Sequence, residues 1–209
     1  FGKIMDINLE PIKVRNFKPQ KKKVILSAYD RKRKQSPESV YERIHYMWFH
    51  FLRLCLELER LGYAVEKKGS DRRVISSTPV RVDRNVYRDW DLDSLEGIKF
   101  KQWYKQMGKN LLFTEGGFKH SGKPQYSTLV KKYNVFIEFM KRKTGDYDKD
   151  VDISEKIIKV YQKERFERLQ RVDPKTGIPL NRNKLEFKRI IMGDIKDCEQ
   201  MILSVCEGR

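Results

Sequence analysis

The first spacing in the chain that could bind a metal ion is a run of alternating aspartates. Its members are Asp146, Asp148, Asp150 and Asp152. A calcium loop of the EF-hand type needs glycine at its sixth position and glutamate at its twelfth. Counted from Asp146, these positions are Val151 and Ile157, so the run does not fit that loop. We expect the carboxylates instead to stabilise the dipole of a helix that begins at Ser154.

Two shorter fragments match parts of catalytic motifs. Glu66 and Lys68 have the E-x-K spacing of restriction-type nucleases, on a stretch that predicts a strand. No Pro-Asp pair precedes them to complete a metal site, so a nuclease is kept only as an alternative. His50 and Arg53 form the H-x-x-R fragment of tyrosine recombinases. We reject this match because the fragment lies within an apolar helix and no distal arginine–tyrosine set is recognisable.

The remaining histidines and the cysteines show no spacing suited to a metal site or a nucleophile. His45 and His120 have no partner at ligand spacing, and the motifs G-x-S-x-G and H-E-x-x-H are absent. Cys55, Cys198 and Cys206 form no C-x-x-C pair. An odd, sparse set of this kind indicates a reducing compartment, with the thiols as small buried side chains. We therefore predict a non-enzymatic protein with no metal and no cofactor.

Positive charge is the strongest chemical signal in the chain. Lysine and arginine number 46 against 29 acidic residues, which gives a net charge of +17. Such a charge favours a polyanion: nucleic acid, an anionic membrane surface or an acidic protein surface. Residues 1–35 hold eleven basic and three acidic residues, nearly half of that net charge. Pro11 and Pro19 argue against a helix there, so we expect an extended basic arm that orders on binding, or else a solvated tail.

Three basic groups are the candidate binding residues for nucleic acid or an acidic partner. The first lies in the arm, the second at the tip of an expected β-hairpin, and the third on one face of a helix expected over 154–171. Basic hairpin tips enter nucleic-acid grooves, although a solvated tip fits the sequence equally well. The residues are Lys21, Lys22, Lys23, Arg31, Lys32, Arg33, Lys34, Lys67, Lys68, Arg72, Arg73, Lys159, Lys163 and Arg168.

The elements that would position these groups are mostly helices. Residues 36–62 begin with a serine–proline pair, end at a glycine, and repeat apolar residues at steps of three and four, so they predict the core helix. Short extended runs at 63–66 and 73–76 flank a turn and predict the hairpin. Aromatic residues over 100–108 share one helix face and are expected to pack on the core helix.

The C-terminal part of the chain predicts three helices joined by turns. After a Gly-rich stretch at 115–124, helices are expected over 127–145, 154–171 and 182–207. A turn at 173–177 separates the last two. Three helices joined by turns form a small bundle.

An aromatic-rich part of the chain resembles a known kind of segment. It comprises Tyr87-Arg-Asp-Trp90, Phe100-Lys-Gln-Trp-Tyr104 and Leu111-Leu-Phe113. It is similar to a segment of small uncharacterised proteins of phages and mobile elements, over fewer than 30 residues. The resemblance implies a viral or mobile-element setting and no particular chemistry.

Together these patterns predict a mainly α protein. A basic N-terminal arm, 1–35, precedes a helical domain with a small β-hairpin, 36–114; a Gly-rich linker, 115–124, leads to a C-terminal three-helix unit, 125–209. We predict a DNA-binding regulator or accessory factor of a phage or mobile element, with DNA favoured over RNA as its partner. The alternative is a virion, scaffolding or capsid-assembly protein, homo-oligomeric, whose arm binds an acidic protein surface. No run of about 18 apolar residues predicts a membrane span, and we expect the protein in the host cytoplasm or with the virion.

Overall fold

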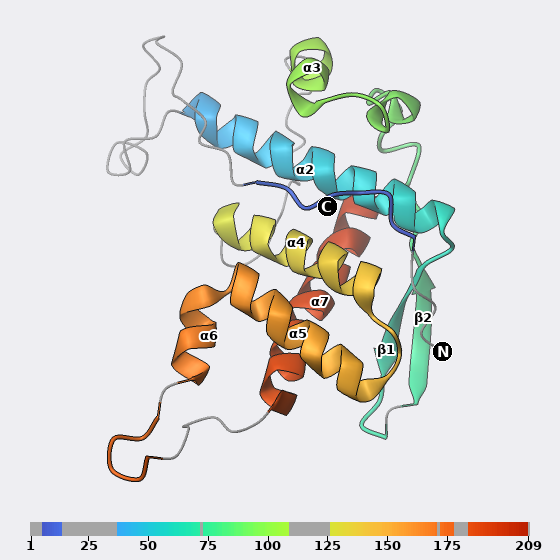
Figure 1. The fold of residues 1–209 in the computed structure, drawn as a ribbon. Coiled ribbons are helices and arrows are strands. Elements are labelled where there is room, and N and C mark those ends of the chain that lie inside the picture. Colours follow the sequence, from blue (N-terminus) through green and yellow to red (C-terminus); the bar gives the residue numbers. More distant parts are fainter. Residues whose placement is uncertain are drawn as a thin grey trace. The chain divides into compact units, whose positions relative to one another are not determined.

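The described part of the chain is mainly helical, with one two-stranded antiparallel hairpin, which confirms the predicted fold class (Figure 1). The computed structural model forms two compact units. The first unit is Phe1–Ile12 with Lys131–Gln200, and the second unit is Lys13–Val130 with Met201–Arg209. The structure describes residues 6–13, 37–71, 73–108, 126–170, 172–177 and 184–208. The predicted Gly-rich linker, 115–124, lies outside these residues.

The predicted core helix is α2, Pro37–Arg60, in the second unit. Phe51, Leu54 and Leu58 on its apolar stripe are completely buried. The helix ends where Gly62 takes a left-handed conformation, with φ of +65°. The amide of Gly62 bonds the carbonyl of Glu59, and the next amide bonds that of Leu58. Together these two bonds satisfy carbonyls that a helix end leaves without partners.

The predicted hairpin consists of β1, Ala64–Lys68, and β2, Val74–Pro79. The strands pair antiparallel with Val65 opposite Thr78 and Lys67 opposite Ser76. Val65 is buried, whereas every residue of β2 is exposed. The second strand therefore depends on its pairing with β1 and leaves its outer surface open to solvent.

The predicted aromatic helix is α3, Phe100–Trp103, which continues as a wider turn, η2, Tyr104–Gly108. It follows the short helix η1, Leu92–Leu95. The rings of Phe100 and Trp103 lie 5.6 and 5.2 Å from the ring of Phe49 on α2. Both contacts are aromatic packing within the second unit, as the sequence predicts. These rings are therefore part of the core of that unit.

The first unit contains most of α4, Tyr126–Arg142, and of α7, Lys184–Cys206, together with α5, Tyr147–Tyr161, and α6, Lys163–Leu169. The first and last of the three predicted C-terminal helices are confirmed as α4 and α7. The predicted turn at 173–177 is also present, closed by a 2.8 Å bond from the amide of Gly177 to the carbonyl of Asp173.

The middle helix begins seven residues earlier than predicted. Asp146 is its N-cap and accepts a hydrogen bond from the amide of Lys149 at 3.1 Å. Ser154 is buried inside α5, where its hydroxyl donates to the carbonyl of Asp150 at 2.7 Å. The prediction of a cap at Ser154 is wrong because that hydroxyl bonds a carbonyl of the preceding turn instead of a free amide.

The middle helix is also broken in two, which the sequence did not predict. At Gln162 the backbone leaves helical geometry, with φ of −139° and ψ of 47°, and α6 begins at the next residue. The prediction of one continuous helix over 154–171 is therefore wrong. Its basic residues belong to two helices that share Gln162 as a boundary.

All three cysteines are buried, as predicted. Burial raises the pKa of Cys198 well above its ordinary value. Cys55 and Cys206 lie in the second unit, and a hydrogen bond from Cys55 lowers the pKa of Cys206. These thiols fill the interior of their units as small apolar side chains do.

Candidate nucleic-acid interface

Six of the fourteen predicted binding residues lie in the part of the chain that the structure describes. Lys67, Lys68 and Arg73 are on the hairpin of the second unit. The other three, Lys159, Lys163 and Arg168, are on α5 and α6 of the first unit. The predicted residues outside the described part are Lys21, Lys22, Lys23, Arg31, Lys32, Arg33, Lys34 and Arg72.

Part of the expected arm lies against the first unit. The side chain of Asn134 on α4 accepts from the amide of Ile12 at 2.7 Å and donates to its carbonyl at 2.8 Å. Ile7 is buried, and Glu10 pairs with Lys141 at 2.8 Å. These contacts fix residues 6–12 against α4, a role that the basic composition of the arm did not indicate. Asn134 carries the only local signal, a polar residue on an apolar helix face.

The hairpin surface comprises Lys67, Lys68 and Arg73, all exposed. Lys68 lies 3.8 Å from Glu66, and Arg73 lies 3.2 Å from Asp71. Within the described residues, no ion pair involves the ammonium group of Lys67. Exposed pairs of this kind contribute little free energy, so phosphate oxygens could replace both carboxylates at small cost. The hairpin therefore presents cations that are available to a polyanion.

The helix surface comprises Lys159, Lys163 and Arg168, also exposed. Its charge is lower than the sequence prediction implied, because α6 places glutamates between its basic residues. Lys163 lies 3.8 Å from Glu167, and the guanidinium of Arg168 donates to the carbonyl of Glu164 at 3.4 Å. Arg168 keeps its full charge in that bond, since a carbonyl is neutral. The helix surface is thus a mixed-charge face with a modest positive excess.

Two aromatic rings pack next to the helix surface. The ammonium of Lys159 lies 5.9 Å from the ring centre of Phe166. That ring is stacked on Phe187 of α7, with centres 5.8 Å apart. A cation above an aromatic face is attracted by the ring quadrupole, which holds Lys159 over the junction of α5 and α6.

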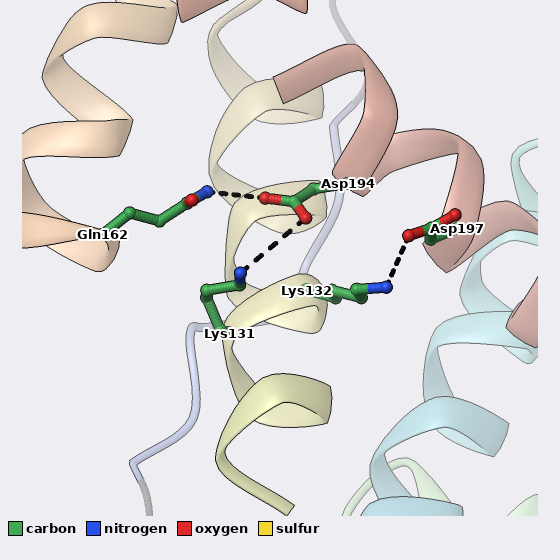
Figure 2. Close-up of polar contacts among 5 residues, drawn as sticks. All are labelled: Lys131, Lys132, Gln162, Asp194 and Asp197. Carbon is green, nitrogen blue, oxygen red and sulfur yellow. Dashed lines mark hydrogen bonds and ion pairs between the residues drawn. The ribbon is translucent and has the colours of Figure 1, made fainter. Parts of the chain in front are cut away.

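A polar cluster inside the first unit holds this junction (Figure 2). The amide nitrogen of Gln162 donates to a carboxylate oxygen of Asp194 on α7 at 2.5 Å. The other oxygen lies 3.8 Å from the ammonium of Lys131 on α4. Next to them, Lys132 and Asp197 pair at 2.5 Å. Figure 2 shows these side chains converging from three elements, so the break between α5 and α6 is tied to both neighbouring helices.

The key residue of the cluster, Asp194, was not among the predicted residues. It is only 7% exposed although it carries a charge. A signal for it exists in the sequence, because it follows Ile190 by four positions and Ile191 by three. Both isoleucines are buried. An aspartate on an apolar helix stripe indicates a buried acid that needs partners.

A shallow depression of about 330 Å³ borders the cluster in the first unit. Its lining has both signs of charge, and Arg189 is already paired with Glu186 at 2.7 Å. The lining residues are Arg165, Glu186, Arg189, Ile190, Gly193, Asp194 and Asp197. This balance of charges favours no single class of ligand.

No family model, curated protein or solved structure matches this chain. The candidate function therefore rests on charge and geometry alone. In the described part of the chain, no group of three or more histidine, cysteine, aspartate or glutamate residues is placed to hold a metal ion. Glu66, the residue of the nuclease alternative, is paired with Lys68 on the exposed hairpin. None of the described helices combines the length and apolar character that crossing a membrane requires.

Proposed function

We propose that this protein is a non-enzymatic nucleic-acid-binding protein that contacts the phosphates of DNA. The net charge of +17 is the observation that carries the proposal. The contacts would come from the basic arm, the hairpin surface and the helix surface. Phosphate contacts of this kind supply most non-specific affinity and position a protein on the duplex.

The placement of the charge supports this proposal. Lys67, Lys68 and Arg73 project from a ribbon whose second strand is exposed along its whole length. Lys159 and Arg168 are exposed on the helices of the other unit. Where these cations have acidic neighbours, the pairs are exposed and weak, so association with phosphate need not break a buried interaction.

The proposal predicts a defined response to removal of charge. Each lysine or arginine that neutralises a phosphate steepens the plot of log K against log salt by about 0.9 for duplex DNA. Replacing Lys67 and Lys68 by alanine should therefore flatten that slope by about 1 to 2. Deletion of residues 1–35, which hold eleven basic residues, should flatten it further.

The experiment is fluorescence anisotropy with labelled duplex DNA, single-stranded DNA and RNA of mixed sequence. The matched control replaces Lys101 and Lys196 by alanine, since both are exposed lysines outside the two surfaces. If the control flattens the slope as much as the hairpin variant does, the hairpin surface is not a specific contact. If none of the three nucleic acids binds, the charge serves an acidic protein partner, and a role in virion or scaffold assembly becomes the better proposal.

A further inference from the structure

Ile75, an exposed aliphatic residue near the tip of the hairpin, has its position set by the register of the two strands. Lys67 is opposite Ser76, but Lys68 is opposite Val74, so Ile75 is the extra residue of a β-bulge. A bulge bends its strand and directs the side chain of the extra residue away from the regular alternation. Ile75 is 65% exposed, and Val74 beside it is 51% exposed.

The backbone of the turn is shaped to receive this side chain. A Cβ atom at Gly69 would lie 3.1 Å from the Cδ1 atom of Ile75 and 3.3 Å from its Cγ1 atom. Contacts so short are tighter than most real Cβ contacts, so a Cβ atom at this position would crowd the isoleucine and also the Oδ1 atom of Asp71, 3.1 Å away. The Ile75 side chain therefore rests over Gly69 at the end of the ribbon.

Charge surrounds this apolar tip. Lys67, Lys68 and Arg73 are exposed on the same end of the ribbon. The minor groove of duplex DNA places phosphates on both sides of stacked base pairs, and isoleucine is one of the residues that proteins insert between base steps. A flanking row of phosphates matches the cations, and the stacked bases match the apolar side chain between them.

We propose that the hairpin enters the minor groove of duplex DNA and that Ile75 inserts between two base pairs, while Lys67, Lys68 and Arg73 contact the flanking phosphates. This inference rests on the proposed function and adds the class of nucleic acid and the mode of contact. Insertion unstacks a base step and kinks the duplex, so DNA that is already unstacked should bind more tightly.

The test compares two labelled duplexes of about 30 base pairs, one intact and one with a central unpaired base. We expect the wild-type protein to prefer the second duplex by about tenfold. Ile75→Ser should reduce this preference to about twofold or less, with little change in affinity for the intact duplex. Gly69→Ala should also reduce the preference because its Cβ would crowd Ile75, although it crowds the carboxylate of Asp71 as well. Val160→Ser is the matched control, since Val160 on α5 is 70% exposed and far from the hairpin in sequence.

The possible results separate the inference from the proposed function. If the wild type binds both duplexes equally, or if Ile75→Ser keeps the preference, then the insertion is refuted while phosphate binding stands. If the wild type binds neither duplex nor any other nucleic acid, both proposals fail. A change of oligomeric state in Ile75→Ser, measured by light scattering, would refute the insertion and assign the tip to contact between copies of the chain. Circular dichroism of each variant checks that it is folded before its binding is compared.

Discussion

Asp194 should be the most sensitive polar residue of the first unit. Its carboxylate accepts a 2.5 Å hydrogen bond from Gln162 and lies 3.8 Å from Lys131. Asp194→Ala removes both interactions and leaves the amide of Gln162, itself 7% exposed, without that acceptor. Loss of a hydrogen bond to a buried charge, with the partner left buried, costs about 1.5 to 3 kcal/mol. The pair with Lys131 adds little, because its side chain is partly exposed.

We therefore expect Asp194→Ala to lower the free energy of unfolding by about 1.5 to 3 kcal/mol. The assay is urea denaturation followed by circular dichroism, with the slope of the unfolding free energy against urea checked for constancy. The control is Asp197→Ala, whose carboxylate is 57% exposed although its partner Lys132 is only 16% exposed. It should cost less than Asp194→Ala, about 1 kcal/mol.

A double-mutant cycle makes the test specific to the pair. Gln162→Ala, Asp194→Ala and the double variant should give a coupling free energy of about 1 to 3 kcal/mol. If the two single changes are additive within about 0.5 kcal/mol, the hydrogen bond between α7 and the break does not stabilise the fold. An equal loss in Asp197→Ala would also contradict the reasoning, because burial would then not distinguish the two aspartates.

Three further predictions concern a buried hydrogen bond, a close contact and a helix cap. Tyr87→Phe removes a hydroxyl that accepts from the indole of Trp48 at 3.0 Å, so it should cost about 1 to 3 kcal/mol in urea denaturation, and a loss below 0.5 kcal/mol would contradict this. Gly208→Ala should lower the melting temperature, because φ is +70° and the new Cβ would lie 2.3 Å from a methyl carbon of Val86; an unchanged value would show that the C-terminal turn does not pack as described. A hydrogen bond from the amide of Lys149 lowers the pKa of Asp146, so its stabilising effect is present above the ordinary carboxyl pKa and is lost as pH falls through the lowered value. The melting temperature of Asp146→Ala should accordingly be lower than that of the wild type at neutral pH, and the two should converge in strong acid.

The elements with a regular pattern could be predicted from the sequence. The stripe of α2 is apolar at steps of three and four, and its Phe51, Leu54 and Leu58 are buried as predicted. Tyr46 and Phe49 are also buried although they lie outside the predicted stripe. Gly62 ends the helix because only glycine adopts a positive φ without strain. The hairpin also followed from short extended runs on either side of a turn.

Features that depend on contacts between residues far apart in the sequence, or on which of two similar residues makes a contact, could not be predicted. Asp146 and Ser154 are both good capping residues, and the sequence does not show which oxygen meets a free amide. At the break, the side-chain amide of Gln162 donates to Asp194, thirty-two positions away, and no local pattern in the sequence indicates that contact. The bulge at Ile75 depends on how the strands pair, which alternation alone does not specify.

The candidate site shows the same division. The sequence identified its basic residues. It did not indicate that the glutamates of α6 contact two of them and reduce the net charge of the helix surface. The proposed insertion at Ile75 rests on the strand register and on the packing of Ile75 over Gly69, which only the structure gives.

The most direct test of the central proposal is the affinity of the full chain for duplex DNA across a salt series. With six to ten phosphate contacts, log K should fall against log salt with a slope of about −5 or steeper. A slope near zero, or no binding near physiological salt, would contradict phosphate recognition as the function of this charge.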